Sequence, residues 1–101
     1  MINLELYRIF KIVADEKNLT KASEILHISQ PAVTKHIKNL EKELNIQLFK
    51  RSKYGMILNE NGKKLYSQIK DSIEILSKAD SIFNTSKDIK LGVHANLSMI
   101  I

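Results

Sequence analysis

The chain has 101 residues and a net charge of +5, with 44% hydrophobic and 27% charged residues but few glycines and prolines. This length allows one compact domain with an appendage, and the composition excludes a low-complexity chain. The absence of cysteine excludes disulfides and thiol-based metal sites. No apolar run approaches the roughly 20 residues of a membrane span, and the N-terminus lacks a signal peptide's apolar core, so we expect a cytoplasmic protein without membrane contact.

The positive charge is concentrated in the middle of the chain. Acidic and basic residues balance in residues 1–34 and in residues 65–101, whereas residues 35–64 hold eight basic and three acidic residues. A local excess of this kind favours a polyanionic partner, but it is also typical of a solvated lysine-rich surface. The charge pattern alone leaves both interpretations open.

Two helices are predicted in the first third of the chain. Residues 4–16 place their apolar side chains on one broad arc at about 100° per residue. Thr20 is a suitable cap for a short second helix that runs to His27. The side chains of this second helix that we expect to face inward are Ala22, Ile25 and Leu26.

A third helix is expected between Ser29, whose hydroxyl can cap its start, and Asn45, which tolerates the left-handed conformation that ends helices. Pro31 fits its first turn, where a missing N–H costs nothing. An edge of about 60° is apolar and is expected to face the core; it carries Val33, Ile37, Leu40 and Leu44. The opposite side has no carboxylate among its polar residues, which are Thr34, Lys35, Lys38 and Lys42.

Two short helices joined by a tight turn, the second with an outward cationic face, are typical of the helix-turn-helix, whose second helix enters the major groove of DNA. In that role Gln30 suits adenine, Lys35 suits guanine O6 and N7, and Thr34 suits a base edge or a thymine methyl. Lys38 and Lys42 suit phosphates, which fix position without reading sequence.

A hairpin and a long helix are predicted next. Residues 47–51 and 56–59 flank SKYG, in which Gly55 can supply a positive φ. From Asn59 a helical pattern runs to about Phe83 with an apolar stripe that a single projecting helix cannot bury. We therefore expect a homodimer, formed through Leu65, Ile69, Ile73, Leu76 and Phe83.

The chain resembles the N-terminal domain of LysR-type transcriptional regulators, and the resemblance is carried by NLTKASEILHISQPAVTKHIKNLEKELNIQLFKR followed by ILNENGKKL. It covers residues 4–65 and implies a mainly α winged helix-turn-helix, with three helices and a short β-hairpin wing, followed by a long dimerisation helix. It implies DNA contacts from the early third helix and from Arg51 and Lys53 in the wing. Asn45 stands where the family usually has glycine, and the wing is less basic than is common.

The resemblance divides the chain into a winged helix-turn-helix (1–58), a linker and dimerisation helix (59–84), and a hinge with the start of an effector-binding domain (85–101). Whether the chain is a fragment or a short protein stays open, and a strand expected at residues 89–93 has no sheet to join. The implied partners are double-stranded DNA and a second copy of the chain. A tetramer of the full-length protein stays open, and a small-molecule effector would bind only a domain beyond residue 101.

No cofactor, metal site or catalytic site is predicted, because the histidines are scattered and no nucleophile, base and acid come together. We therefore expect a regulator and not an enzyme. The alternative is a winged-helix module that binds proteins or dimerises while its basic face is idle. The residues that we expect at a DNA interface are Thr20, Ser29, Gln30, Pro31, Thr34, Lys35, Lys38, Lys42, Arg51 and Lys53.

Overall fold

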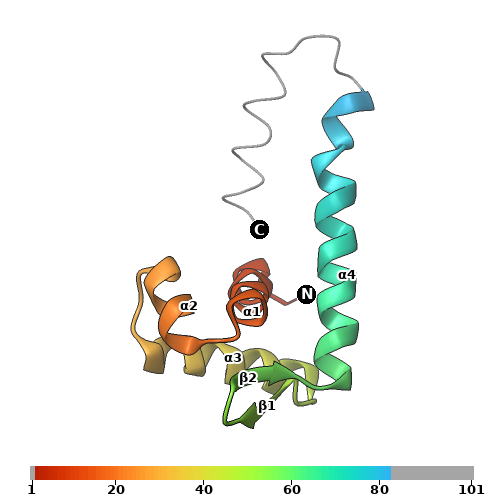
Figure 1. Cartoon of the computed structure of the whole chain (residues 1–101). Coiled ribbons are helices and arrows are strands. Elements are labelled where there is room, and N and C mark those ends of the chain that lie inside the picture. The colour runs from red at the N-terminus through yellow and green to blue at the C-terminus, as the bar shows by residue number, and fades with distance from the viewer. Residues whose placement is uncertain (1, 83–101) are drawn as a thin grey trace.

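The computed structural model describes residues 2–82 (Figure 1). Its elements are, in chain order, α1 (Leu4–Glu16), α2 (Leu19–Leu26), α3 (Gln30–Leu44), β1 (Phe49–Ser52), β2 (Gly55–Leu58), α4 (Glu60–Ser77) and a 3-10 turn, Ala79–Ile82. Together they form a mainly helical winged helix-turn-helix, as predicted. Phe83 and the expected hinge and strand in residues 85–101 lie outside the described residues.

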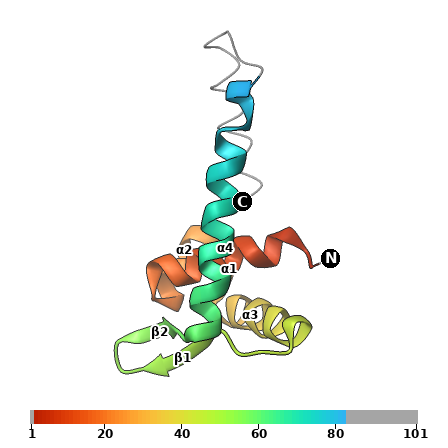
Figure 2. The same cartoon turned by 90° about the vertical axis from the view of Figure 1, so that its right-hand side faces the viewer.

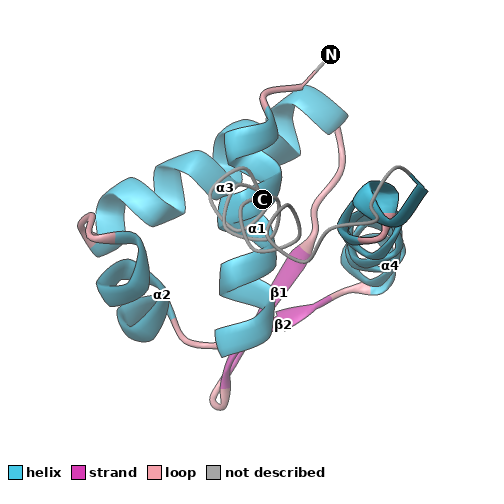
Figure 3. Ribbon diagram, turned by 90° about the horizontal axis from the view of Figure 1, so that it is seen from above, coloured by secondary structure: helices cyan, strands magenta, loops and turns pink. Residues whose placement is uncertain are grey.

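The core forms where α1 packs against α3 and the wing, with α2 closing one side (Figures 1 and 3). The predicted apolar arc of α1 and the apolar edge of α3 are both buried, which confirms these two assignments. The rings of Phe10 and Phe49 lie 5.4 Å apart and fix the wing to α1. The buried apolar residues are Leu6, Ile9, Phe10, Val13, Ala14, Ala22, Val33, Ile37, Leu40, Leu48, Phe49 and Ile69.

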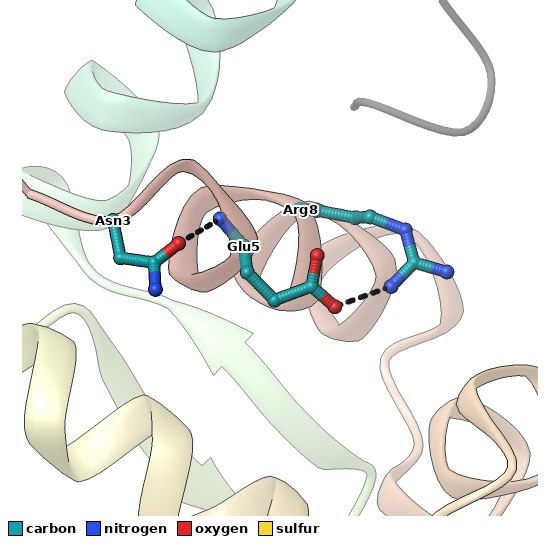
Figure 4. Close-up of polar contacts among 3 residues, drawn as sticks. All are labelled: Asn3, Glu5 and Arg8. Atoms are coloured by element: carbon teal, nitrogen blue, oxygen red, sulfur yellow. Dashed lines mark hydrogen bonds and ion pairs between the residues drawn. The ribbon is translucent and has the colours of Figure 1, made fainter. Parts of the chain in front are cut away.

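Side-chain caps set the boundaries of the first and third helices. At the start of α1 the Asn3 side chain accepts a hydrogen bond from the Glu5 N–H, and Glu5 pairs with Arg8 one turn later (Figure 4). At α3 the Ser29 hydroxyl accepts from the Ala32 N–H at 3.2 Å, as the sequence predicts. Asn45 ends α3 with φ 56°, so its predicted left-handed conformation is confirmed.

The second helix differs from the prediction at its start and on its inward face. Asn18 caps it in place of Thr20, because the Asn18 side-chain oxygen accepts from the Lys21 N–H at 3.0 Å. Ile25 is 48% exposed and not inward. At 100° per residue it lies about 110° from the centre of the arc that the helix buries. The residues on that arc are Leu19, Ala22, Ser23 and Leu26.

The hairpin is antiparallel, with Phe49 opposite Leu58 and Ser52 opposite Gly55, which has φ 117°. Its first strand begins two residues later than predicted, because the Leu48 N–H leaves the ladder while the Leu48 carbonyl still bonds the residue opposite it, Asn59. The Leu48 N–H donates to the Glu41 carboxylate at 2.7 Å. The Leu48 carbonyl accepts from the backbone N–H of Asn59 at 2.9 Å.

Asn59 joins the fourth helix to the wing. Its side-chain oxygen caps α4 by accepting from the Gly62 N–H at 2.8 Å, and its amide group donates to the Gln47 carbonyl at 2.9 Å. Gly62 comes so near the chain before the wing that an added Cβ would lie 2.1 Å from the Leu48 carbonyl oxygen. These contacts fix the direction in which α4 leaves the domain.

The apolar stripe of α4 is divided between this chain's own core and solvent. Ile69 is buried, and Leu65 and Ile73 pack against the core, so the rest of the domain already covers the first half of the stripe that α4 cannot bury alone. Leu76, in the second half of the stripe, is 42% exposed. Ile75 is 70% exposed and lies about 100° around the helix from Leu76, on the side away from the stripe. Their part of α4 rises beyond the other helices (Figures 1 and 2).

The α-helical part of α4 ends at Ser77 and not near Phe83 as predicted. The Ser77 hydroxyl donates to the Glu74 carbonyl, and the Ser81 hydroxyl donates to the Lys78 carbonyl. Beyond Lys78 the chain continues as a 3-10 turn, Ala79–Ile82. Within residues 2–82, no helix has the length and hydropathy that crossing a membrane requires.

Candidate nucleic-acid interface

An open groove follows the outward face of α3, and we call it the α3 groove. It is lined by Leu19, Gln30, Pro31, Thr34, Lys35, Lys38, Asn39 and Arg51. The first of these residues belongs to α2 and the last to β1, so helix and wing contribute to one surface. In Figure 1, α3 and the hairpin lie at one end of the molecule and the free end of α4 lies at the other.

The cations of this surface point into solvent without acidic partners. Lys35, Lys38 and Arg51 are exposed, and so is Lys42 one turn further along α3. Among the described residues, the ion pairs are Arg8–Glu5, Lys11–Asp15 and Lys63–Glu60, none of which includes a cation of the α3 groove. Unpaired cations that share one face produce a positive potential suited to a polyanion.

One carboxylate of α3, that of Glu41, has a structural role. Glu41 is half-buried, and its carboxylate accepts the Leu48 N–H at 2.7 Å. It lines a smaller hollow between α3 and the wing together with Thr34 and Lys38. Glu41 therefore connects the third helix to the chain before the wing.

The other predicted site residues lie around the α3 groove. Ser29 uses its hydroxyl to cap α3. Lys42 and Lys38 line a shallow hollow at the C-terminal half of the helix. Lys53 lies at the wing, where its ammonium is 5.2 Å from the centre of the exposed Tyr54 ring. Thr20, on α2, accepts a hydrogen bond from Gln30.

Three residues at this surface were not predicted from the sequence. Asn39 lines the α3 groove, and its position four residues after Lys35 is a helical signal that could have found it. Leu19 lines the same groove from α2. Lys17 lines a neighbouring hollow with Arg51 and Lys53, and only the packing of the wing against the α1–α2 turn brings it there.

A polar cluster at the junction of α1 and α4 lies apart from this surface. Asp15 accepts hydrogen bonds from Lys11 and from the Tyr66 hydroxyl. Partial burial tends to raise the pKa of Asp15, but these hydrogen bonds and the charges of Lys11 and Lys70 outweigh it and lower the pKa below the ordinary value. The hydrogen bond to Asp15, followed by burial, raises the pKa of Tyr66. In the part of the chain that the structure describes, no histidine and carboxylate cluster could hold a metal ion.

Comparison with known proteins agrees with the winged helix-turn-helix architecture. Residues 4–63 match the family of bacterial regulatory helix-turn-helix proteins, lysR family. The chain is 36% identical to the HTH-type transcriptional regulator BudR of Klebsiella aerogenes, over 97% of this chain and 66% of that protein. It is 41% identical to a probable RuBisCO transcriptional regulator of Phaeodactylum tricornutum, over 95% of this chain but only 30% of that protein.

Solved structures show the same fold. The DNA complex of the CbnR DNA-binding domain superposes with a TM-score of 0.69 and 26% identity, over 79% of this chain and 92% of that one. The complex of the BenM DNA-binding domain with benA site 1 DNA gives 0.67 and 34%, over 87% and 99%. The class of protein is therefore a winged helix-turn-helix domain. The chain belongs to the LysR family.

Proposed function

We propose that this chain is the DNA-binding part of a LysR-type transcriptional regulator and that it binds double-stranded DNA through the α3 groove. The observation that carries the proposal is the alignment of Lys35, Lys38 and Arg51 on one exposed face. An α-helix fits the major groove, and cations beside it neutralise phosphates. The DNA complexes of the relatives CbnR and BenM support the same use of the fold.

The proposed DNA contacts fall into two groups, those to base edges and those to phosphates. Gln30, Thr34 and Lys35 at the start of α3 read base edges, and Pro31 packs beside them. Phosphates are held by the remaining polar residues, which are Thr20, Ser29, Lys38, Lys42, Arg51 and Lys53. Within this division residues 1–58 bind DNA and residues 59–84 link two copies. Within this proposal the protein acts in the cytoplasm.

A homodimer is part of the proposal. Two recognition helices on successive half-sites convert modest single-site affinity into selectivity. The exposed Ile75 and Leu76, at the end of α4 remote from α3, are the apolar surface available for a second copy. Tetramers of the full-length protein would need further contacts, and sedimentation distinguishes them from dimers.

The test is the affinity of the chain for a fluorescent duplex pool at several salt concentrations. We expect log affinity to fall linearly with log salt. Lys38→Ala should weaken binding to all sequences and lower the salt slope by about one, whereas Lys35→Ala should relax preference at one base position. Lys70→Ala, a lysine exposed on α4, is the matched control and should change neither. Unchanged affinity in both Lys35→Ala and Lys38→Ala would favour the alternative of a protein-interaction module.

A further inference from the structure

The side-chain amide of Gln30 is held by a hydroxyl from the neighbouring helix. Nε2 of Gln30, the first residue of α3, donates to Oγ1 of Thr20 on α2 at 2.9 Å, although ten residues separate them. Both residues are exposed, and Gln30 lines the α3 groove. The contact therefore lies at the candidate interface and not in the core.

In this hydrogen bond the Gln30 amide directs its NH2 group at Thr20. A hydroxyl can also donate to an amide oxygen, so the contact selects this orientation when the hydrogen of Thr20 is donated to a phosphate. A free glutamine amide turns about its last torsion, which exchanges the positions of oxygen and nitrogen. With one N–H of Gln30 directed at Thr20, the second N–H and Oε1 keep fixed positions. One donor and one acceptor in this arrangement form the pair that binds N7 and N6 of adenine in the major groove.

Thr20 is itself well anchored. It lies in the first turn of α2, and its carbonyl accepts the hydroxyl of the buried Ser23 at 2.7 Å. Ala22 of the same helix is fully buried in the core. The Thr20 hydroxyl accepts in its bond with Gln30 and donates to no group within residues 2–82, so its hydrogen is available to a phosphate oxygen.

We infer that Thr20 is a positioning residue for sequence reading, which holds the Gln30 amide in the orientation that recognises one base. This inference rests on the proposed binding of DNA through α3. Thr20 would then connect a phosphate, through its own hydroxyl, to the base read by Gln30. A phosphate contact made by Thr20 alone would strengthen binding without changing preference.

The experiment selects bound duplexes from a pool with a randomised central segment, using the full chain and three variants. Gln30→Ala removes the reading group, Thr20→Val keeps the shape of threonine without its hydroxyl, and Thr20→Ser restores the hydroxyl. We expect Gln30→Ala and Thr20→Val to lose preference at the same base position by about fivefold or more. Thr20→Ser should keep the parent preference.

Two results would overturn the inference while leaving DNA binding intact. One is parent preference in Thr20→Val together with its loss in Gln30→Ala; the other is equal weakening of Thr20→Val on every sequence. A parent chain that binds no duplex would instead reject the proposed function and this inference with it.

NMR of the free chain tests the contact itself, because Thr20→Val should shift the Gln30 side-chain amide protons and Thr20→Ser should not. Unshifted protons in Thr20→Val would show that the hydrogen bond is absent.

Discussion

Gly62 shows how one residue fixes the start of α4. A Cβ at this position would lie 2.1 Å from the carbonyl oxygen of Leu48 and 2.8 Å from a side-chain carbon of Leu58. The carbonyl cannot move away freely, because it also accepts the N–H of Asn59. Helix propensity alone favours alanine over glycine by about 1 kcal/mol. Here the steric conflict with the backbone should exceed that gain.

We predict that Gly62→Ala lowers the free energy of unfolding by up to about 2 kcal/mol, since overpacking costs about 1 to 3 kcal/mol before the propensity gain of about 1 kcal/mol is subtracted. Urea denaturation measures the change. Asn61→Ala, an exposed neighbour in the same helix, is the control and should stay within about 0.5 kcal/mol of the parent. A more stable Gly62→Ala variant would show that the chain before the wing is not held as described.

At the residue scale, two of the three predicted helix-terminal residues are confirmed and the Thr20 cap is wrong, whereas contacts between distant residues were not predictable. Ser29 and Asn45 act through the backbone beside them, so residue type and position were enough to predict their roles. The Glu41–Leu48 and Thr20–Gln30 hydrogen bonds depend on how two elements meet in space. No pattern in the sequence indicates that these pairs of residues are in contact.

At the element scale, the junction of α1 and α4 depends partly on charge. Asp15 of α1 accepts hydrogen bonds from Lys11 and from Tyr66 of α4. The folded pKa of Asp15 is lowered, so its contribution to stability is present above about pH 4 and is lost as pH falls through the lowered value. The folded pKa of Tyr66 is raised, so its contribution is present below about pH 10 and is lost as pH rises through the raised value.

Tyr66→Phe should therefore raise the pKa of Asp15 toward its ordinary value, because a hydrogen bond to the carboxylate is removed. The loss of stability near pH 7 should stay below about 1 kcal/mol, since the pair is exposed to solvent. NMR titration of the Asp15 carboxyl measures the pKa directly. Tyr7→Phe is the control, because the Tyr7 hydroxyl forms no hydrogen bond to any residue in 2–82, and it should leave the Asp15 titration unchanged. An unaltered Asp15 pKa in Tyr66→Phe would contradict the contact.

The elements themselves were largely predictable from apolar spacing. The bounds of α1 and the face of α3 follow from periodicity, because each of these helices buries one continuous arc. The end of α4 was not predictable, because the apolar spacing continues past Ser77, where the α-helix ends. The prediction that Ile25 of α2 faces inward is wrong, because this residue is apolar but lies off the buried arc.

At the scale of the whole molecule, the proposed dimer uses two separate surfaces. The wing and the α3 groove bind DNA, and the free end of α4 contacts the second copy. The first half of the α4 stripe packs on this chain's own core, which leaves the exposed Leu76 of the stripe, with the exposed Ile75 next to it in the chain, for a partner. Replacing both with Asp should place charges in the proposed interface and shift the chain toward monomer. Sedimentation velocity measures this shift.

Ile25→Asp is the matched control, because Ile25 is an exposed apolar residue on α2, away from α4. It should leave the dimer intact. A dimer that persists in the double Asp variant would move the interface to another surface.

The central claim is that the exposed face of α3, together with the wing, binds duplex DNA. Titration of the isotope-labelled chain with a duplex, followed by amide NMR, tests it most directly. We predict that the largest shifts fall on residues 29–42 and 51–53, and that Ile25 and Ile75 change little. Shifts centred on α4 or on the outer side of α2, or no shifts at all, would contradict the claim.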